Sequence, residues 1–322
     1  PINQAARGIA PALAAGNAVV SKPSEFTSTS TIELARIATE CGLPAGVLNV
    51  VTGTGPELGA PLVEHPDVRK VAFTGSIRAG REIGKIAAER IIPLTLELGG
   101  KSPNLVFSDA DMAQAVPGSM RAFVTNAGQV CMAGTRLLLQ EEIHDEFVAA
   151  LSEAIQAVKP GQVIGPMTTE DQYRKVQDYY GIAREEGATA VTGGDLPADP
   201  ELAGGWFVAP TIYTGVRNDM RIAREEIFGP VVSVIPFTDE EQAIEIANDT
   251  SYGLAAGLWT RDLSRAHRVA AQLEAGQVYV NEWVTGPVEI PFGGYKQSGY
   301  GREKGIEALH HYTQVKCVTI KL

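Results

Sequence analysis

The sequence is poor in cysteine and histidine, with 3 cysteines and 5 histidines among its 322 residues. Cys41, Cys131 and Cys317 are odd in number, widely spaced and form no CxxC pair. This spacing argues against a disulfide framework and a zinc site, and it favours a reducing, cytoplasmic setting. The histidines form no recognisable pattern with a cysteine, which removes most of the support for a cysteine protease. We therefore expect no metal.

Long apolar runs and clusters of basic residues are also missing. No run reaches the roughly 20 apolar residues of a membrane span, and no charged-then-apolar signal segment opens the chain. Lys and Arg total 27 against 38 Asp and Glu, and the net charge of -11 argues against a nucleic-acid or anionic-membrane partner. The 44% of hydrophobic and 20% of charged residues are typical of a globular protein. The composition thus favours a soluble protein with a small-molecule partner.

Helix and strand signals alternate over residues 1–98. Strands are expected at 18–21, 47–51 and 71–76 and in the apolar run that ends at Glu97, and helices at 3–15, 31–41 and 78–89. Helices and strands that alternate at these lengths predict βαβ units and a parallel sheet covered on both faces.

Residues 99–302 repeat the alternation with longer helices. Helices are expected at 112–125, 143–158, 169–186, 239–248 and 263–273, and strands at 136–140, 188–192, 231–236, 254–259 and 277–281. Gly99-Gly100 is a plausible hinge, so the pattern predicts two α/β domains. Residues 312–322 alternate and are rich in β-branched side chains, which indicates an edge strand that pairs with another copy of the chain.

Two short stretches carry candidate chemistry. Cys131 lies in a glycine-punctuated turn between a predicted helix and a predicted strand. A cysteine alone is more often a buried structural residue, but Gly128 and Gly134 in a polar loop favour a reactive thiol. Glu97 ends an apolar strand just before Gly-Gly, where it could be a helix cap, an ion-pair partner or a general base with a raised pKa.

Three loops could bind a dinucleotide, each beside a simpler interpretation. Gly53-Thr-Gly55-Pro-Glu-Leu-Gly59 has GxGxxxG spacing, which alone is more typical of an ordinary strand-to-helix turn. Ser76 opens a helix whose amides and dipole suit a pyrophosphate, although it could be a plain helix cap. Lys22 and Glu25 follow a strand end and could bind ribose hydroxyls, or they are simply solvated charges.

Together these stretches resemble the NAD(P)-dependent aldehyde dehydrogenase superfamily. Six motifs in the family's order carry the resemblance: Lys22-Pro-Ser-Glu25, Phe73-Thr-Gly-Ser76, Leu96-Glu-Leu-Gly-Gly-Lys-Ser-Pro103, Gly128-Gln-Val-Cys131, Glu225-Glu-Ile-Phe-Gly-Pro230 and Pro291-Phe-Gly-Gly-Tyr-Lys296. The resemblance implies an α/β fold. Its parts are an N-terminally incomplete, Rossmann-like NAD-binding domain at 1–98, a catalytic α/β domain at 99–302, and a C-terminal helix and oligomerisation strand at 303–322.

The resemblance also implies a chemistry. Cys131 attacks an aldehyde to give a thiohemiacetal, hydride passes to the nicotinamide, and Glu97 activates the water that hydrolyses the resulting thioester. The backbone amide of Cys131 contributes to the oxyanion site. Glu25 favours NAD over NADP, which stays possible, because a carboxylate repels the 2'-phosphate. The presence of Glu97 favours hydrolysis over transfer to CoA.

The expected contacts follow from the same motifs. By the resemblance, Lys22 and Glu25 hold the adenosine ribose, and Ser76 holds the pyrophosphate. Glu226 and Phe228 hold the nicotinamide ribose and ring. The other cofactor-binding residues are Gly55, Phe73, Gly75, Leu98 and Gly99. The substrate-pocket residues are Phe123, Val130, Met132 and Trp283, with Val284 and Val288 nearby. The expected partners are a small aldehyde and other copies of the chain in a homodimer or homotetramer.

The start of the chain departs from the family's pattern. Pro1 matches the proline of a Trp-Asn-x-Pro motif, so the asparagine that completes the oxyanion site falls before it. The chain is therefore expected to be roughly the C-terminal two thirds of such an enzyme. Two alternatives stay open: a catalytically incompetent fragment or binding protein that keeps the fold, and a CoA-acylating aldehyde dehydrogenase.

Overall fold

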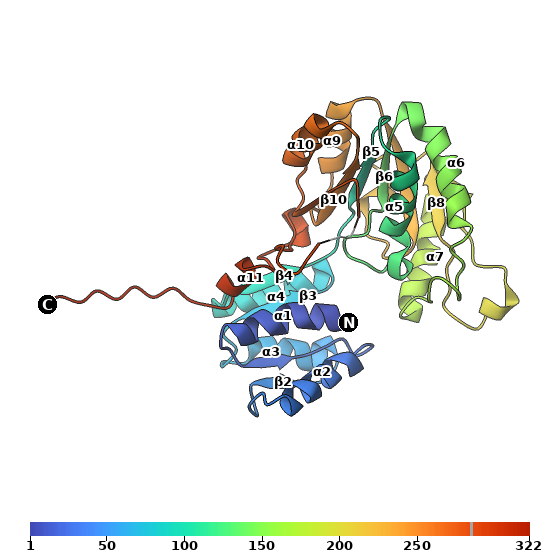
Figure 1. The fold of residues 1–322 in the computed structure, drawn as a ribbon. Helices are drawn as coiled ribbons and strands as arrows, with labels where there is room; N and C mark the ends of the chain where they lie inside the picture. The colour runs from blue at the N-terminus through green and yellow to red at the C-terminus, as the bar shows by residue number, and fades with distance from the viewer. Residues whose placement is uncertain (284–285) are drawn as a thin grey trace. The chain divides into compact units, whose positions relative to one another are not determined.

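The computed structural model describes residues 1–283 and 286–322, and the chain divides into two compact units (Figure 1). The first unit comprises residues 1–98, 286–293 and 299–322, and the second comprises 99–285 and 294–298. The division after Leu98 coincides with the expected hinge at Gly99-Gly100. Residues 286–293 and 299–302, which the sequence placed in the second domain, group with the first unit. The functions assigned to the two domains stay predictions.

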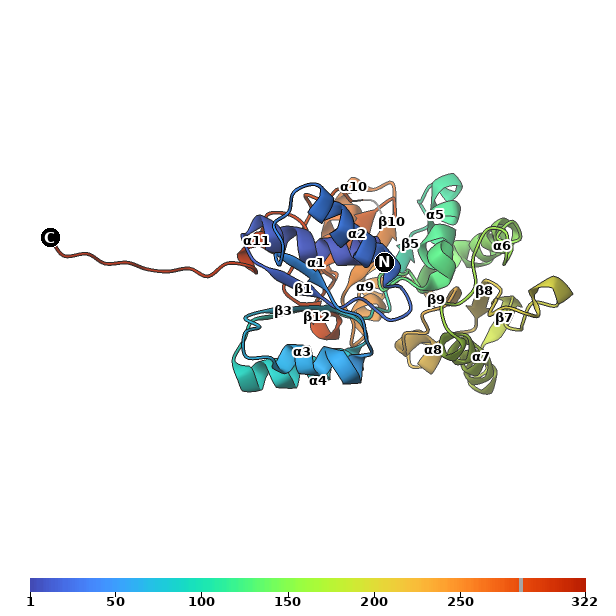
Figure 2. The ribbon, with the colours of Figure 1, turned by 90° about the horizontal axis from the view of Figure 1, so that it is seen from below.

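The first unit is built from short parallel strands and amphipathic helices. Its elements are α1 (Ile2–Ala14), β1 (Val19–Ser21), α2 (Thr29–Glu40), β2 (Leu48–Val50), α3 (Ala60–Glu64), β3 (Val71–Thr74), α4 (Ile77–Arg90), β4 (Leu94–Glu97), β12 (Gly299–Tyr300) and α11 (Glu307–His310). β1 pairs with β2 in parallel, and β4 lies between β3, which is parallel, and β12, which is antiparallel. In Figure 2, α1 and α2 lie on one side of these strands and α3 and α4 on the other.

Local sequence signals explain where these elements begin and end. Gly16, with φ +82°, follows the end of α1, because glycine adopts the left-handed conformation without strain. Ser76 caps α4 by accepting a hydrogen bond from the N–H of Ala79 at 3.2 Å. The GxGxxxG stretch, expected to be a turn, instead forms a π-helical turn over Gly55–Gly59 that continues into α3. Thr54 caps this turn through the N–H of Glu57.

The second unit is a doubly covered, mostly parallel sheet. Its elements are β5 (Pro103–Val106), α5 (Met112–Val124), β6 (Arg136–Gln140), α6 (His144–Ile155), α7 (Glu170–Glu185), β7 (Thr189–Thr192), β8 (Thr211–Thr214), α8 (Arg221–Arg224), β9 (Val231–Phe237), α9 (Glu240–Asn248), β10 (Ala255–Trp259), α10 (Leu263–Gln272) and β11 (Gln277–Val280). The strand order is β11-β10-β5-β6-β9-β8-β7, and only β7 runs antiparallel within the described residues.

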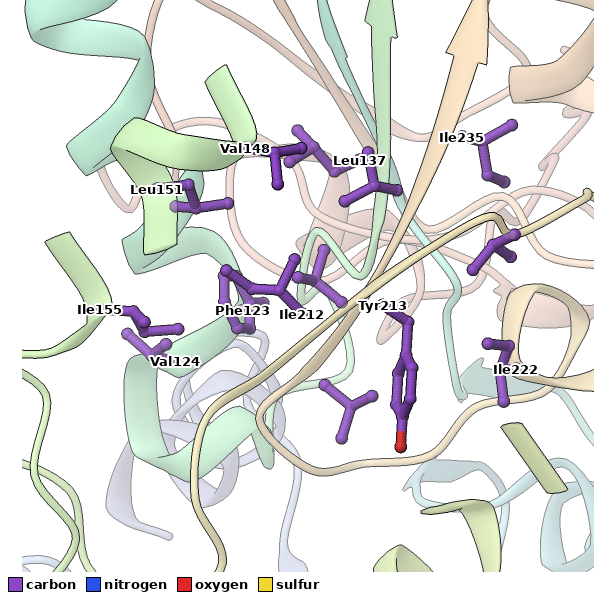
Figure 3. Packing of buried hydrophobic residues seen from close by; sticks show 14 of the residues in the cluster. Phe123, Val124, Leu137, Val148, Leu151, Ile155, Ile212, Tyr213, Ile222 and Ile235 are labelled. Carbon is purple, nitrogen blue, oxygen red and sulfur yellow. The ribbon is translucent and has the colours of Figure 1, made fainter. Parts of the chain in front are cut away.

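Successive side chains of the central strands enter two different cores. Leu137 and Leu139 of β6 belong to the core under α5, α6 and α7, whereas Leu138 between them belongs to the core under α9 and α10. This is the two-residue alternation of a strand buried on both faces. Figure 3 shows the first core, where Phe123 of α5 and Leu151 of α6 pack near Leu137. A parallel sheet with helices on both faces confirms the predicted α/β class.

The C-terminal segment is extended beyond α11 (Figure 1). Residues 313–322 pair with no strand among the described residues, and Val315 and Leu322 are fully exposed. The expected edge strand does not form within one chain, because a strand needs a partner for its backbone N–H and C=O groups. Its pairing with a second copy stays a prediction.

Candidate active site

Cys131 follows a loop with an unusual backbone. After α5 ends, Asn126, Ala127 and Gly128 all adopt left-handed conformations, with φ of 53°, 53° and 72°. Asparagine and glycine tolerate this region, but an alanine there is strained. Such strain persists only where neighbouring structure fixes the backbone. The loop is therefore held by its surroundings.

Close backbone contacts restrain this loop. A Cβ on Gly128 would lie 2.1 Å from the carbonyl carbon of Gly229, so only glycine fits. A Cβ on Gly100 would lie 2.4 Å from the carbonyl oxygen of Cys131. The second glycine of the Leu-Gly-Gly motif therefore allows its backbone to pass directly beside Cys131, which is half-buried.

Glu97 ends β4 in a buried setting. The residue is 2% exposed, and among residues 1–283 and 286–322 neither carboxylate oxygen has a hydrogen-bond partner. The pKa of Glu97 is raised to about 8, chiefly by burial and also by the carboxylate of Glu303, while Arg7 and Arg302 oppose the rise. A carboxyl group that titrates near neutral pH suits general-base catalysis.

A buried ion pair lies in the same unit as Glu97. Arg7 of α1 meets Glu303 at 2.8 Å, with the two side chains 9% and 4% exposed. The guanidinium of Arg7 also stacks over the ring of Phe292 at 4.0 Å. Burial raises the pKa of Glu303, whereas Arg7 lowers it. These partners are far apart in the sequence, and no local pattern indicated the pair.

The predicted adenosine-side residues lie on loops of the first unit. The ammonium of Lys22 donates to the carbonyl oxygens of Pro23 and Gly53 at 2.8 and 2.9 Å, and lies 3.9 Å from the carboxylate of Glu25. Glu25 and Ser76 are exposed. The hydroxyl of Ser76 already serves as a helix cap, as the simpler interpretation expected.

The neighbouring glycines of the first unit are explained by packing. Phe73 lies over Gly75, where a Cβ would approach the ring to 2.5 Å, and a Cβ on Gly80 would meet Leu98 at 2.7 Å. Gly55 opens the π-helical turn and has open space beside it. The cofactor contacts of Gly55, Phe73, Gly75 and Leu98 stay predictions.

The predicted nicotinamide-side residues gather in the second unit. The carboxylate of Glu226 accepts a hydrogen bond from the N–H of Gly100 at 3.1 Å, and a Cβ on Gly99 would lie 2.2 Å from it. Burial raises the pKa of Glu226, and the Gly100 N–H opposes the rise. Phe228 has φ +61°, and the amide of Gln172 donates to its carbonyl oxygen at 2.9 Å.

The predicted pocket residues do not form one group. Met132 and Trp283 pack in one small apolar cluster, and a Cβ on Gly134 would lie 2.9 Å from the Trp283 ring. Phe123 is 1% exposed and belongs to the main core instead. Val130 is half-buried, Val288 is 73% exposed, and Val284 lies outside the described residues. The pocket itself stays a prediction.

The sequence singled out neither Lys101 nor Gln172 as a site residue. Lys101 is 1% exposed, its ammonium has no hydrogen-bond partner within the described part of the chain, and burial lowers its pKa to about 7. Its place in Leu96–Pro103 was the available signal. No group of three His, Cys, Asp or Glu that could hold a metal occurs among the described residues. None of the described helices has the length and apolar character needed to cross a membrane.

Comparison with known proteins identifies the family. The model of the aldehyde dehydrogenase family matches residues 1–318. The chain belongs to the aldehyde dehydrogenase family. It is 48% identical to a betaine aldehyde dehydrogenase of Mesorhizobium japonicum, over 100% of this chain and 67% of that protein. It is 46% identical to the 4-trimethylaminobutyraldehyde dehydrogenase of Homo sapiens, over 97% of this chain and 65% of that protein.

Solved structures of aldehyde dehydrogenases share the fold. The indole-3-acetaldehyde dehydrogenase of P. syringae, in complex with NAD+, matches with a TM-score of 0.96 and 45% identity, covering 99% of this chain and 66% of that one. The betaine aldehyde dehydrogenase of Staphylococcus aureus, also with NAD+, matches with a TM-score of 0.94 and 42% identity, covering 97% and 63%. The chain therefore spans about two thirds of the length of these aldehyde dehydrogenases.

Proposed function

We propose that this protein oxidises an aldehyde to a carboxylic acid with NAD, through a covalent intermediate on Cys131. The observation that carries the proposal is the environment of Glu97. A buried carboxylate with no hydrogen-bond partner among the described residues costs stability. Such a cost is typical of a group retained for its reactivity. Membership of the aldehyde dehydrogenase family supports the same conclusion.

The chain's own residues supply two chemical roles. The thiolate of Cys131 adds to the aldehyde carbon, and its backbone amide contributes to binding the oxyanion that forms. After oxidation leaves a thioester, Glu97 in its ionised form takes a proton from the attacking water. Collapse of the resulting tetrahedral species releases the acid and restores the Cys131 thiolate. Because the pKa of Glu97 is about 8, this last step accelerates as the pH rises towards that value.

The residues present fit a dinucleotide. The exposed carboxylate of Glu25 can bind ribose hydroxyls, and the N-terminus of the 14-residue helix α4 offers a positive dipole to a pyrophosphate. Glu226 accepts one hydrogen bond through one carboxylate oxygen, from Gly100, which leaves further acceptor capacity for a second ribose. NAD bound by these groups would accept the hydride. The relatives crystallised with NAD+ support this choice of cofactor.

A matched pair of cysteine variants tests the proposal. NADH formation is followed by absorbance with a panel that includes betaine aldehyde, 4-trimethylaminobutyraldehyde and indole-3-acetaldehyde. Cys131→Ser should abolish turnover, whereas Cys41→Ser, at an exposed thiol on the surface of the first unit, should retain it. Equal turnover in Cys131→Ser and in the unmodified protein would show that Cys131 is not the nucleophile. A rate that depends on added CoA would instead identify the CoA-acylating class.

A further inference from the structure

The residue two positions before Cys131 makes a bridge that no sequence motif predicts. The side-chain oxygen of Gln129 accepts hydrogen bonds from both the backbone N–H and the hydroxyl of Thr168, each at 2.9 Å. Its side-chain nitrogen donates to the carbonyl oxygen of Asn126 at 3.2 Å. One amide therefore joins the start of the left-handed turn to a segment 39 residues further along the chain.

The turn is tied to Gln129 by its backbone as well. The N–H of Gln129 donates to the carbonyl oxygen of Asn126 at 3.1 Å, and the side-chain amide of Asn126 donates back to the carbonyl oxygen of Gln129 at 3.1 Å. These bonds close a small ring around Ala127 and Gly128, whose left-handed backbone needs external restraint. The bridge to Thr168 joins this ring to a distant segment of the chain.

Thr168 is itself held on both sides. The preceding Met167 is 1% exposed, and its N–H donates to the carbonyl oxygen of Trp206 at 2.8 Å. The following Thr169 caps α7 by accepting from the N–H of Gln172 at 3.2 Å. Thr168 is thus fixed by the buried residue before it and by the helix cap after it. Gln129 is therefore bonded to a rigid part of the fold.

The same end of α7 also holds the second loop of the site. The side-chain amide of Gln172 donates to the carbonyl oxygens of Ile227 and Phe228, both at 2.9 Å. Gly128 packs directly against Gly229, the residue that follows Phe228. Residues 168–172 therefore make hydrogen bonds to both the loop of Cys131 and the loop of Glu226–Phe228.

We infer that Gln129 is a positioning residue for Cys131, which sets the thiol relative to the Glu226–Phe228 loop through its bridge to Thr168. The inference rests on the proposed function, because positioning matters when Cys131 is the nucleophile. The bridge is partly exposed to water, so its loss should weaken the loop more than the fold. Geometry at the reacting atom, by contrast, is sensitive to displacements of about 1 Å.

Three variants test this role. Gln129→Met keeps the length and removes every side-chain hydrogen bond. Gln129→Glu keeps an acceptor for Thr168 and loses the donor to Asn126. Gln114→Met is the matched control, because its side-chain amide makes one surface hydrogen bond, to Asp111 at 3.0 Å, on the helix before the loop.

The first measurement separates positioning from general damage. Gln129→Met should lower kcat by about tenfold to a hundredfold while the KM for NAD stays within about twofold, since an error in placement acts on the reacting state. Gln129→Glu should lose less, because the acceptor for Thr168 remains. Gln114→Met should behave as the unmodified protein. An unchanged kcat in Gln129→Met, or the same loss in Gln114→Met, would overturn the inference.

The second measurement is independent of turnover. Labelling by iodoacetamide, read peptide by peptide in a mass spectrometer, should rise at Cys131 relative to the exposed Cys317 by about threefold or more in Gln129→Met, as the loop loosens. If the unmodified protein produces no NADH, the proposed function fails while this ratio still decides the inference. If Gln129→Met does not fold, Thr168→Val, which removes the hydroxyl donor of the bridge, decides it. A labelling ratio and kcat equal to those of the unmodified protein in that variant would refute the bridge.

Discussion

Replacement of Glu97 by glutamine should stabilise the protein increasingly as the pH rises, measured as the free energy of unfolding of the variant minus that of the unmodified chain. Glu97 is 2% exposed and its pKa is raised to about 8, chiefly by burial, from an ordinary 4.5. A group with a raised folded-state pKa stabilises the fold below its unfolded pKa, and that contribution is lost as the pH rises through the folded value. Glutamine has the same shape and no charge, so it is insensitive to this titration.

The size of the effect follows from linkage. At about 1.4 kcal/mol per pH unit, the unmodified protein loses stability over roughly 2.5 units, from pH about 5.5 until Glu97 ionises in the folded state near pH 8. The loss between pH about 5.5 and about 8.5 is therefore about 3 kcal/mol. The free energy of unfolding of Glu97→Gln minus that of the unmodified protein should therefore grow by this amount over the interval. Any pH-independent cost of burying the amide cancels in the comparison.

The assay must report on the unit that contains Glu97. The three tryptophans, Trp206, Trp259 and Trp283, all lie in the second unit, so their fluorescence does not follow the first. Urea unfolding should be monitored by far-ultraviolet circular dichroism, together with hydrogen exchange of the β4 amides. Glu64→Gln, at an exposed position on α3 of the same unit, is the control and should show no such trend. A difference that is constant with pH would mean that the pKa of Glu97 is not raised in the folded protein, and the argument from its burial would fail.

Three further outcomes are expected. Gly128→Ala should destabilise the second unit by about 2–4 kcal/mol in a tryptophan-monitored urea titration, because φ +72° and backbone contacts exclude a Cβ. Gly181→Ala, inside α7 with open space beside it, should be neutral or slightly stabilising, and an equal loss there would contradict the argument. Glu303→Gln should lower the free energy of unfolding by about 3–5 kcal/mol, because it leaves the buried charge of Arg7 without its partner. Adding Arg7→Met should restore part of this stability, and a double variant that recovers none would show that the loss does not come from the ion pair. NAD should raise the Tm of the unmodified protein more than NADP does, and Glu25→Ala should reduce this difference between the two Tm shifts. An unchanged difference would remove Glu25 from cofactor selection.

Most helices and strands were predictable from sequence, including short strands such as β1, β2 and β3, but β5, β8 and β12 were not. The helices at α4, α7 and α10 and the strands at β6 and β9 begin and end within two residues of their predicted bounds. β5 and β8 are four residues each, β5 begins at a proline, and β12 has two residues within a glycine-rich stretch. These three strands carry no recognisable alternation, and their pairing is fixed by neighbours from distant parts of the chain.

The candidate site shows the same limit. The motifs located Cys131 and Glu97 because residue type and flanking glycines are local properties. The left-handed backbone of Ala127, the bridge from Gln129 and the ion pair of Glu303 depend on contacts between segments far apart in the chain. Sequence patterns do not encode such contacts directly, so only the folded structure could reveal them.

The pairing of β4 has a consequence during synthesis of the protein. Its antiparallel partner places Gly299 opposite Glu97, and these residues are 202 positions apart in the chain (299 − 97). At roughly 5–20 residues per second, a ribosome needs about 10–40 s to add that length. During this interval one edge of β4 carries unsatisfied N–H and C=O groups, which are a template for pairing with another nascent chain. The strand that carries Glu97 therefore remains an open sheet edge until β12 has been synthesised.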